Sequence, residues 1–483
     1  MIYNKILENI VFPLGDKVLH THFINKLKYW RNVVDKKNAN ELQKMQKEGL
    51  EKLLQHTVNK IPFYKNKNIQ LTGDPYADIK QFPIMYKNVI KENIADMYLG
   101  NKNKMVVERS SGSSGVQGEV YMTLDENVDY MAIQTYLWEW GGYKMGAPLL
   151  QTGITPKRVG IKKMKDMALR TLYVPAFNLS YDVILSNLLD AKKRGCKYFA
   201  GYASSLNVYA EVALKENLDI KFEGVISWGD KLFDSYKNTI NNAFGSPSIA
   251  EVYGTTEGFM MAGLCPQGNH HVLTPHVYLE LLDKDGNEVK PGELGFVVVT
   301  RLDAYSFPLV RYYLGDMAIK QNENATCSCG KNYPMLQKIV GRDTDIVHTP
   351  QGKALIVHFF TYVFEHQPTI QQFRIIQRIP GNIDIEYIPD EGFTPDVLTR
   401  ISNIICEKAE EVFPIKFIEV KVIPATASGK PQLVLNSVVK KMHDLKQSQN
   451  HASAQQNNAS QDRDIVRMVN DNTDYRPKSI SCK

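Results

Sequence analysis

The hydrophobic and polar positions of the chain follow two periods, and the change between them divides the sequence into regions. Residues 38–58 carry apolar side chains at helical spacing, and the predicted helix stops before Ile61-Pro62 because the residue before a proline disfavours helical geometry. From about residue 105, short apolar runs alternate with helical segments. This alternation predicts a layered α/β domain.

The elements expected in this α/β region are short strands, each followed by a helix or another strand. We place strands at 120–122, 198–200, 224–227 and 249–252, and helices at 180–193 and 204–215. A β-rich part follows, with strands at 277–283 and 295–300 on either side of a turn at 284–287.

After Gly341-Arg342 the pattern predicts a small α+β unit: helix 355–365, strand 369–377, strand 383–389, helix 395–412 and strand 418–422. Beyond His443 the sequence is polar and buries too little apolar surface to offset its ordering entropy. We therefore predict four parts, namely a helical segment at 1–104 packed on the large domain, an α/β core with a β-rich subdomain at 105–341, a small C-terminal domain at 342–441 and a disordered tail at 442–483.

The composition argues against several classes of protein. The chain has 483 residues, 43% of them hydrophobic, with 58 Lys and Arg against 52 Asp and Glu. The apolar content suffices for a large core, and a net charge of +6 is too dilute for a nucleic-acid-binding surface. No stretch reaches the roughly 18 apolar residues of a membrane span. The charged N-terminus also lacks the uncharged core of a signal peptide.

The basic excess lies in residues 1–104, which hold 18 Lys and Arg against 10 Asp and Glu. A solvated helix surface explains this excess. The alternative is a face that attracts CoA phosphates or the surface of a membrane. A peripheral membrane contact therefore stays open. A homodimer is also possible. Six cysteines in a chain of this length do not make a disulfide scaffold, and we expect a reducing cytoplasm.

One segment has the composition of a phosphate-binding loop. It reads Ser110-Ser111-Gly112-Ser113-Ser114-Gly115 and lies between two short apolar runs. Glycines allow a close backbone approach, and hydroxyls with successive N–H groups can surround phosphate oxygens, although a flexible hairpin is the alternative. Four further motifs follow in order, at residues 251–258, 311–316, 341–345 and 428–430.

This ordered set resembles the adenylate-forming superfamily of acyl-CoA synthetases and adenylation domains. Within it the chain is most similar to phenylacetate–CoA ligase and its relatives in capsular-polysaccharide clusters, since Ile61-Pro62-Phe63-Tyr64 and residues 201–205 also fit that branch. The resemblance covers about residues 1–441. It implies a large α/β domain with a small C-terminal lid domain.

The implied chemistry is attack of a carboxylate on the α-phosphate of ATP, which gives acyl-AMP, followed by transfer of the acyl group to CoA. Two alternatives stay open. The acyl group could pass to an amine or a sugar hydroxyl in polysaccharide biosynthesis, or the chain could be a degenerate nucleotide-binding protein without turnover. Two departures from the family pattern favour the latter: Val116 and Thr344 stand where relatives often have Lys and Asp.

The resemblance also implies roles for single residues. The six residues from Ser110 to Gly115 would hold the β- and γ-phosphates of ATP. The remaining nucleotide contacts would be Tyr253 at the adenine, the adjoining Gly254, Thr255 near the α-phosphate, and Asp316 and Arg342 at the ribose. The catalytic set would be Thr255, Glu257 as a ligand of Mg²⁺, and Lys430 on the small domain. The alternatives are a solvated carboxylate for Glu257, a turn residue for Asp316, a surface ion pair for Arg342 and a solvated Lys430.

The acid pocket is implied by position alone. Tyr202, Trp228, Gly229 and Asp230 fall where relatives line this pocket, although relatives have Glu in place of Asp230. Aromatic and small residues suit a planar or short acid, and they suit core packing equally well. The identity of the acid therefore stays open.

A second set of residues has the chemistry of a metal site. Cys265 and His271 flank one turn, and Cys327 and Cys329 lie in another. If the two turns converge, they supply three thiolates and one imidazole, a closed set suited to structural Zn²⁺. His270 could replace His271, and the alternative is a group of free loop thiols with an unrelated histidine.

Overall fold

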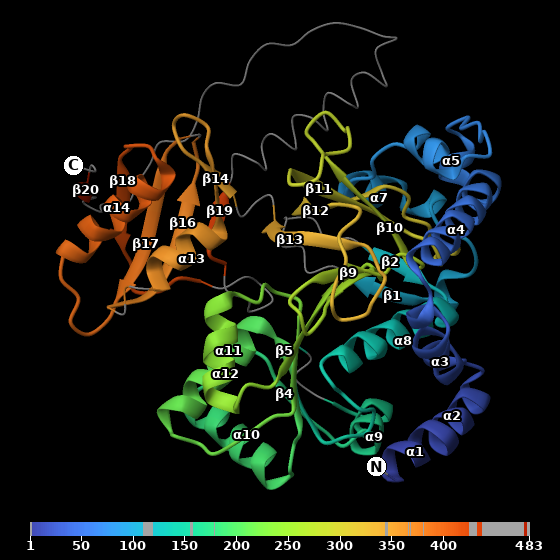
Figure 1. Cartoon of the computed structure of the whole chain (residues 1–483), viewed down its shortest axis with the longest axis horizontal. Helices are drawn as coiled ribbons and strands as arrows, with labels where there is room; N and C mark the ends of the chain where they lie inside the picture. The colour runs from blue at the N-terminus through green and yellow to red at the C-terminus, as the bar shows by residue number, and fades with distance from the viewer. Residues whose placement is uncertain are drawn as a thin grey trace, which may run out of the picture. The chain divides into compact units, whose positions relative to one another are not determined.

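The computed structural model describes residues 2–109, 119–154, 158–177, 179–342, 346–365, 367, 369–379, 381–424, 432–436 and 478–480. These residues form two compact units, one that ends at Val340 and one that starts at Gly341 (Figure 1). The predicted phosphate loop, Val116, Thr344, Lys430 and most of the predicted tail lie outside the described residues.

An eleven-stranded sheet forms the centre of the first unit, and its strand order is β10-β11-β12-β13-β9-β8-β7-β6-β5-β3-β4. The strands from β4 to β7 are parallel, whereas β7 to β9 and β10 to β12 pair antiparallel. The bounds are β3 (Leu149–Gly153), β4 (Thr171–Pro175), β5 (Tyr198–Tyr202), β6 (Gly224–Trp228), β7 (Ser248–Gly254), β8 (Met260–Leu264), β9 (His270–Val272), β10 (Val277–Leu282), β11 (Leu294–Arg301), β12 (Tyr312–Lys320) and β13 (Met335–Arg342). The predicted α/β part and β-rich part are confirmed, and they share one sheet.

Helices cover both faces of the parallel half because successive residues of each strand point to opposite sides. Phe199 and Val225 pack with Leu188 and Leu206 in one apolar cluster, while their neighbours Tyr198 and Ile226 pack with α8 residues in another. The helices α10 to α12 lie together beside β4 and β5, with α8 on the opposite side (Figure 1). Their bounds are α8 (Leu124–Trp140), α9 (Ile161–Ala168), α10 (Tyr181–Lys193), α11 (Ala203–Lys215) and α12 (Asp234–Phe244).

The N-terminal 104 residues are largely helical; Ile24 and Leu27 pack in the cluster of α8 and the parallel strands, whereas residues from Leu50 onward pack on the antiparallel half. Helix α4 starts with a capping box between Asn38 and Glu41 and ends where Pro62 follows Ile61. Leu50 and Leu53 of α4 belong to the same buried cluster as Val299 of β11. The bounds are α1 (Ile2–Ile6), η1 (Leu7–Val11), α2 (Phe12–Leu19), α3 (Phe23–Asn32), η2 (Val34–Lys36), α4 (Ala39–Lys60), α5 (Pro62–Lys65), α6 (Pro75–Asp78), η3 (Ile79–Gln81), α7 (Lys87–Asn93), η4 (Ile94–Asp96) and η5 (Lys102–Lys104).

The second unit is a small α+β fold. Its five-stranded sheet has the order β19-β16-β17-β18-β20, and a separate hairpin joins β14 to β15. The bounds are β14 (Ile346–His348), β15 (Ala354–Ile356), α13 (Val357–Glu365), β16 (Ile370–Gln377), β17 (Ile383–Pro389), α14 (Asp396–Ala409), β18 (Ile415–Glu419), β19 (Val434–Asn436) and β20 (Lys478–Ile480).

Two predicted elements of this unit are placed wrongly in the sequence. The strand expected at 418–422 is β18 at Ile415–Glu419, because Ile415 and Phe417 are the buried positions whereas Val422 is 72% exposed. The helix expected from 355 starts at Val357, since Leu355 pairs with Val347 in the β14–β15 hairpin. No helix in the described part of the chain is long and apolar enough to cross a membrane.

Candidate functional site

A tight turn follows β7 and carries most of the predicted nucleotide residues. Its shape depends on two glycines. A Cβ on Gly254 would come 2.8 Å from the Phe259 carbonyl oxygen, and Gly258 has a φ of +90° and a Cβ there would come 2.7 Å from the Arg301 guanidinium. The Thr255 N–H closes the turn by donating to the Phe259 oxygen at 2.8 Å. Residues 254–258 are therefore held in one conformation at the end of the strand.

The predicted adenine and ribose residues lie against each other. Tyr253 at the end of β7 donates from its hydroxyl to the Asp316 carboxylate of β12 at 2.8 Å. The two residues are 63 positions apart in the sequence. Arg342, the other predicted ribose residue, ends β13 and belongs to the second unit.

Glu257 is buried with a lysine beside it. Its carboxylate is 3.3 Å from Nζ of Lys87 and accepts a hydrogen bond of 3.2 Å from the Tyr312 hydroxyl. Burial opposes ionisation, but the Lys87 ammonium and nearby donors hold the pKa of Glu257 below its ordinary value. The site thus keeps a negative charge and a positive charge side by side. Lys87 was not among the residues predicted from the sequence.

The strand that follows the predicted phosphate loop runs beside Glu257. Strands β1 (Val106–Arg109) and β2 (Glu119–Met122) pair antiparallel, with Arg109 opposite Glu119. Residues 120–122 of β2 line one small cavity together with Glu257 and Phe259. The described strands on both sides of the loop thus belong to the same part of the molecule as the turn.

A buried polar network centred on Arg301 packs against the turn. Arg301 is 2% exposed and donates to the Asp303 carboxylate at 2.5 Å and to the Glu126 carbonyl at 2.8 Å. His276 accepts from the Met260 N–H through Nε2, so its Nδ1 carries the proton and donates to Asp303 at 2.7 Å. Burial opposes the charge on Asp303, but Arg301 and His276 hold its pKa well below the usual range.

The four predicted pocket residues gather at the carboxyl ends of β5 and β6. Trp228 stacks on Trp138 with ring centroids 5.1 Å apart, and the Tyr202 ring lies 6.4 Å from Trp228. Gly229 has a φ of +79°, and a Cβ there would come 2.5 Å from the Tyr202 ring. This arrangement gives an aromatic wall where parallel sheets bind ligands.

Asp230 is directed to the start of helix α11. Its carboxylate accepts from the N–H groups of Ala203 at 2.5 Å and Ser204 at 3.2 Å, and from the Ser204 hydroxyl. These donors are among those left without partners at a helix N-terminus. Asp230 therefore fixes the junction between β5 and α11, which positions the neighbouring Tyr202. Burial and the nearby Asp230 raise the pKa of Tyr202 to about 12, so its hydroxyl is neutral.

The two cysteine-containing turns converge. The side-chain ligand atoms of Cys265, His271, Cys327 and Cys329 all lie within 4.8 Å of one another. Sγ of Cys265 is 3.7 Å from Sγ of Cys327, and Nε2 of His271 is 3.3 Å from Sγ of Cys329. Two sulfurs bound tetrahedrally at the usual zinc–sulfur distance lie about 3.8 Å apart, so the cluster has the dimensions of a zinc site.

The two consecutive histidines point in opposite directions. Nδ1 of His271 is 3.3 Å from the Tyr333 carbonyl, which leaves Nε2 facing the cysteines. Nε2 of His270 instead lies 3.1 Å from the carboxylate of Glu251 in β7. The geometry thus selects His271 from the two histidines that the sequence left open. The strand β9 therefore contacts the cysteine cluster through His271 and strand β7, which carries Tyr253, through His270.

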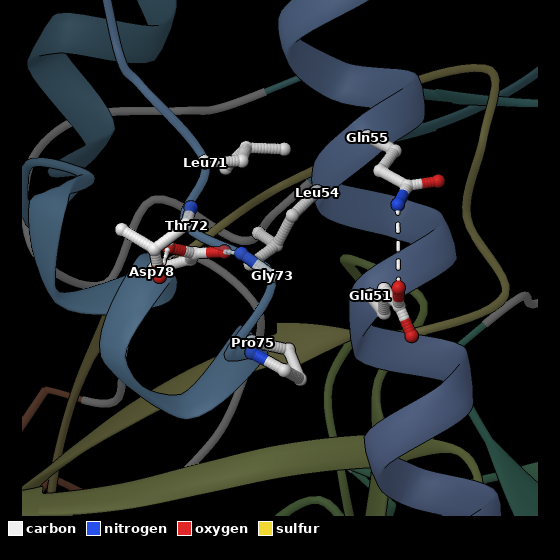
Figure 2. A pocket seen from close by; sticks show the side chains of 8 residues that line it. All are labelled: Glu51, Leu54, Gln55, Leu71, Thr72, Gly73, Pro75 and Asp78. Carbon is white, nitrogen blue, oxygen red and sulfur yellow. Dashed lines mark hydrogen bonds between the residues drawn. The ribbon is translucent and has the colours of Figure 1, made fainter.

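A separate pocket of about 260 Å³ lies between α4 and the segment before α6. Its polar groups bind one another: Asp78 accepts from the Thr72 and Gly73 N–H groups, and Gln55 donates to Glu51 (Figure 2). None of its lining residues belongs to a motif singled out from the sequence. We assign it no role.

The comparisons with known proteins agree with the motifs. No protein-family model matches the chain. Over 454 residues the chain is 21% identical to Protein CapK of Staphylococcus aureus, covering 90% of this chain and 99% of CapK. It is also 21% identical over 362 residues to the phenylacetate-coenzyme A ligase of Thermus thermophilus, covering 71% of this chain and 80% of that ligase.

Solved structures of a CoA ligase are similar to this chain in fold. A 2-hydroxyisobutyryl-CoA ligase in its postadenylation state superimposes with a TM-score of 0.64 at 18% identity, covering 86% of this chain and 94% of that one. The same ligase in an open conformation with an acyl-AMP and CoA gives a TM-score of 0.55 at 19% identity, covering 82% and 92% of the two chains. The chain is therefore similar in sequence to Protein CapK and to a phenylacetate-coenzyme A ligase, and similar in fold to a CoA ligase that forms acyl-AMP, in agreement with the resemblance that its motifs predicted.

Proposed function

We propose that this protein activates a carboxylic acid as acyl-AMP at the expense of ATP and transfers the acyl group to CoA. The observation that carries the proposal is the contact between Tyr253 and Asp316 next to the buried Glu257. In a fold similar to that of 2-hydroxyisobutyryl-CoA ligase, this contact joins the residues expected to bind adenine and ribose, and Glu257, the candidate cation ligand, lies in the turn that follows Tyr253.

In the first step a carboxylate oxygen of the acid forms a bond to the α-phosphorus of ATP, and the bond from that phosphorus to the bridging oxygen breaks, which releases pyrophosphate. Tyr253 and Gly254 would contact the adenine, Asp316 and Arg342 the ribose, and Thr255 the α-phosphate. Residues Ser110 to Gly115 would hold the β- and γ-phosphates. Lys430 would assist this step, and in the second step the CoA thiolate attacks the acyl carbon and AMP leaves.

Glu257 is our candidate ligand for Mg²⁺, whose chemistry would be to offset the negative charge of the phosphates. A buried, ionised carboxylate suits a hard cation. Lys87 at 3.3 Å from this carboxylate would add a second positive charge. Such a charge would compensate for Val116, which stands where relatives often have a lysine.

The acid would bind at the ends of β5 and β6, against Tyr202, Trp228 and Gly229. The aromatic wall favours a planar or short acid because an extended chain would have to displace stacked rings. Asp230 would act indirectly, by holding Tyr202 in place through α11.

ATP–pyrophosphate exchange across a panel of aryl and short-chain acids tests the first step. We expect exchange with at least one acid, and formation of its thioester when CoA is added. Glu257→Gln should abolish exchange, whereas Glu108→Gln on β1 serves as a carboxylate control. Absence of exchange with every acid, while the protein still binds ATP, would favour the degenerate nucleotide-binding alternative.

The second candidate is transfer of the acyl group to an amine or a sugar hydroxyl. Similarity to Protein CapK, which spans nearly all of both chains, favours it because the motifs resemble relatives from capsular-polysaccharide clusters. Exchange without thioester formation, followed by amide or ester formation with an added amine or sugar, would support this candidate over CoA transfer.

We also propose that Cys265, His271, Cys327 and Cys329 hold a structural Zn²⁺. Four protein ligands fill a tetrahedral shell and leave no position for substrate, so the ion would stabilise the fold and take no part in the reaction. Metal analysis of the purified protein should give near-stoichiometric zinc, and its absence would contradict this assignment.

A further inference from the structure

The first helical stretch of the chain presents an apolar face to solvent. Of the 22 large apolar side chains exposed in the described part of the chain, seven fall within residues 3–19. Ile6, Ile10, Leu14 and Val18 recur at intervals of four, which places them on one side of a helix. Their exposure rises from 41% at Ile6 to 76% at Val18. Apolar clusters of this kind mark interaction surfaces.

The opposite side of the same stretch is anchored to the protein. Leu7 is 2% exposed and packs so closely on Gly146 that no Cβ fits there. Glu8 pairs with Arg31 at 2.9 Å, and the same guanidinium pairs with Glu139 of α8. The outward direction of the apolar face is therefore fixed by contacts on its far side.

Helix α9 extends this surface. The Tyr3 hydroxyl of α1 donates to the Ala168 carbonyl at the end of α9 at 2.7 Å, and the two helices lie side by side (Figure 1). Met164 and Met167 of α9 are each 70% exposed. Flexible methionine side chains adapt to irregular apolar surroundings.

On these segments the lysines are free to meet a partner, whereas the carboxylates are paired within the protein. Lys5, Lys17, Lys162 and Lys163 are exposed. Every carboxylate in residues 2–19 and 158–170 is engaged by the protein itself. These carboxylates are Glu8 with Arg31, Asp16 with Thr21 and the N–H groups of Phe23 and Ile24, and Asp166 with Arg158.

We propose that this surface, formed by the Ile6–Val18 face of α1, η1 and α2 together with α9, docks the protein on an anionic phospholipid bilayer. Apolar side chains would enter the boundary between headgroups and acyl chains while the lysines meet lipid phosphates. A second copy of the chain fits less well because a two-fold interface would oppose each lysine to the same lysine cluster. Docking does not depend on the ligase reaction.

Vesicle sedimentation of the full chain tests this proposal. We expect binding to vesicles of phosphatidylcholine mixed with phosphatidylglycerol, weaker binding to phosphatidylcholine alone, and weakening by added salt. The double variant Leu14→Glu/Val18→Glu should lower the affinity for the mixed vesicles by at least about tenfold. It removes two apolar side chains that would be buried in the lipid boundary when the protein is bound. Val412→Glu is the matched control, since Val412 is 73% exposed in the second unit and should have no effect.

Two readouts keep the test decisive. An unchanged thermal unfolding midpoint in the double variant shows that the loss is one of binding. Failure of the wild-type chain to bind mixed vesicles, or equal binding by the double variant, overturns the proposal. So does a wild-type dimer in sedimentation velocity that the double variant converts to a monomer while neither binds vesicles.

Discussion

The Tyr253 hydroxyl of β7 donates a hydrogen bond of 2.8 Å to the Asp316 carboxylate of β12, although the two residues are 63 positions apart in the sequence. The carboxylate is the group proposed to accept the ribose hydroxyls, and Tyr253 holds it in place. Asp316→Asn should raise the KM for ATP by roughly 10- to 100-fold, since a hydrogen bond to a charged group contributes about 1.5–3 kcal/mol. Tyr253→Phe keeps the aromatic ring and should raise the KM for ATP by a smaller factor. Equal KM values for wild type and Asp316→Asn in pyrophosphate exchange would rule out this role.

The pair between Lys87 and Glu257 predicts a pH-dependent stability. The folded pKa of Glu257 is depressed, so the stabilisation it gives is present above its ordinary pKa and is lost as the pH falls through its folded pKa. Lys87→Met leaves the carboxylate buried without this partner and should lower the free energy of unfolding by about 1–3 kcal/mol near neutral pH. Urea unfolding over a range of pH should show this difference shrinking in acid. A difference that stays constant across that range would contradict the assignment.

The two histidines of β9 should behave differently when each is replaced by alanine. His271→Ala removes a proposed zinc ligand and should lose the metal, with a lower thermal midpoint. His270→Ala should retain zinc, because its imidazole faces Glu251 and not the cysteines. Elemental analysis of the two variants side by side is the measurement, and zinc loss in both or in neither would contradict the site.

Gly229 should be intolerant of a side chain for two separable reasons. Gly229→Ala puts a Cβ at a positive φ and 2.5 Å from the Tyr202 ring, so it should raise the KM for the acid as well as destabilise the fold. Gly286→Ala is the control, with a φ of +86° and no atom within 4 Å of the added carbon. Both variants should lose about 1–2 kcal/mol from backbone strain, and Gly229→Ala alone should change the acid KM. Equal KM values for the acid in the two variants would show that Tyr202 takes no part in binding the acid.

Much of the first unit follows from local sequence pattern. The alternation of apolar runs and helical spacing predicted β5, β6, β7, α10 and α11, because β5 and β6 are buried along most of their length and α10 buries one face. The same reasoning misplaced β18, where Ile415, Phe417 and the exposed Val422 are equally apolar. Pattern alone cannot decide which of several apolar positions a neighbouring strand will cover.

The candidate site was only partly predictable for a related reason. The order of the motifs predicted that Tyr253, Glu257 and Asp316 belong together, and two of them are in contact. Lys87 was missed because its partner lies 170 residues further along, and nothing in its local sequence marks it. The choice between His270 and His271 depended on which side of a three-residue strand each imidazole takes, which adjacent positions of identical chemistry do not reveal.

The central sheet changes from parallel to antiparallel pairing at β7, and the proposed acid and nucleotide sites lie on opposite sides of that change. Under the proposed function, selectivity for the acid would be carried by the loops after β5 and β6, while nucleotide recognition would depend on the turn after β7 and on β12. The two requirements can diverge independently. Grafting residues 198–230 from a homologue with another acid should transfer its substrate preference and leave the affinity for ATP unaltered.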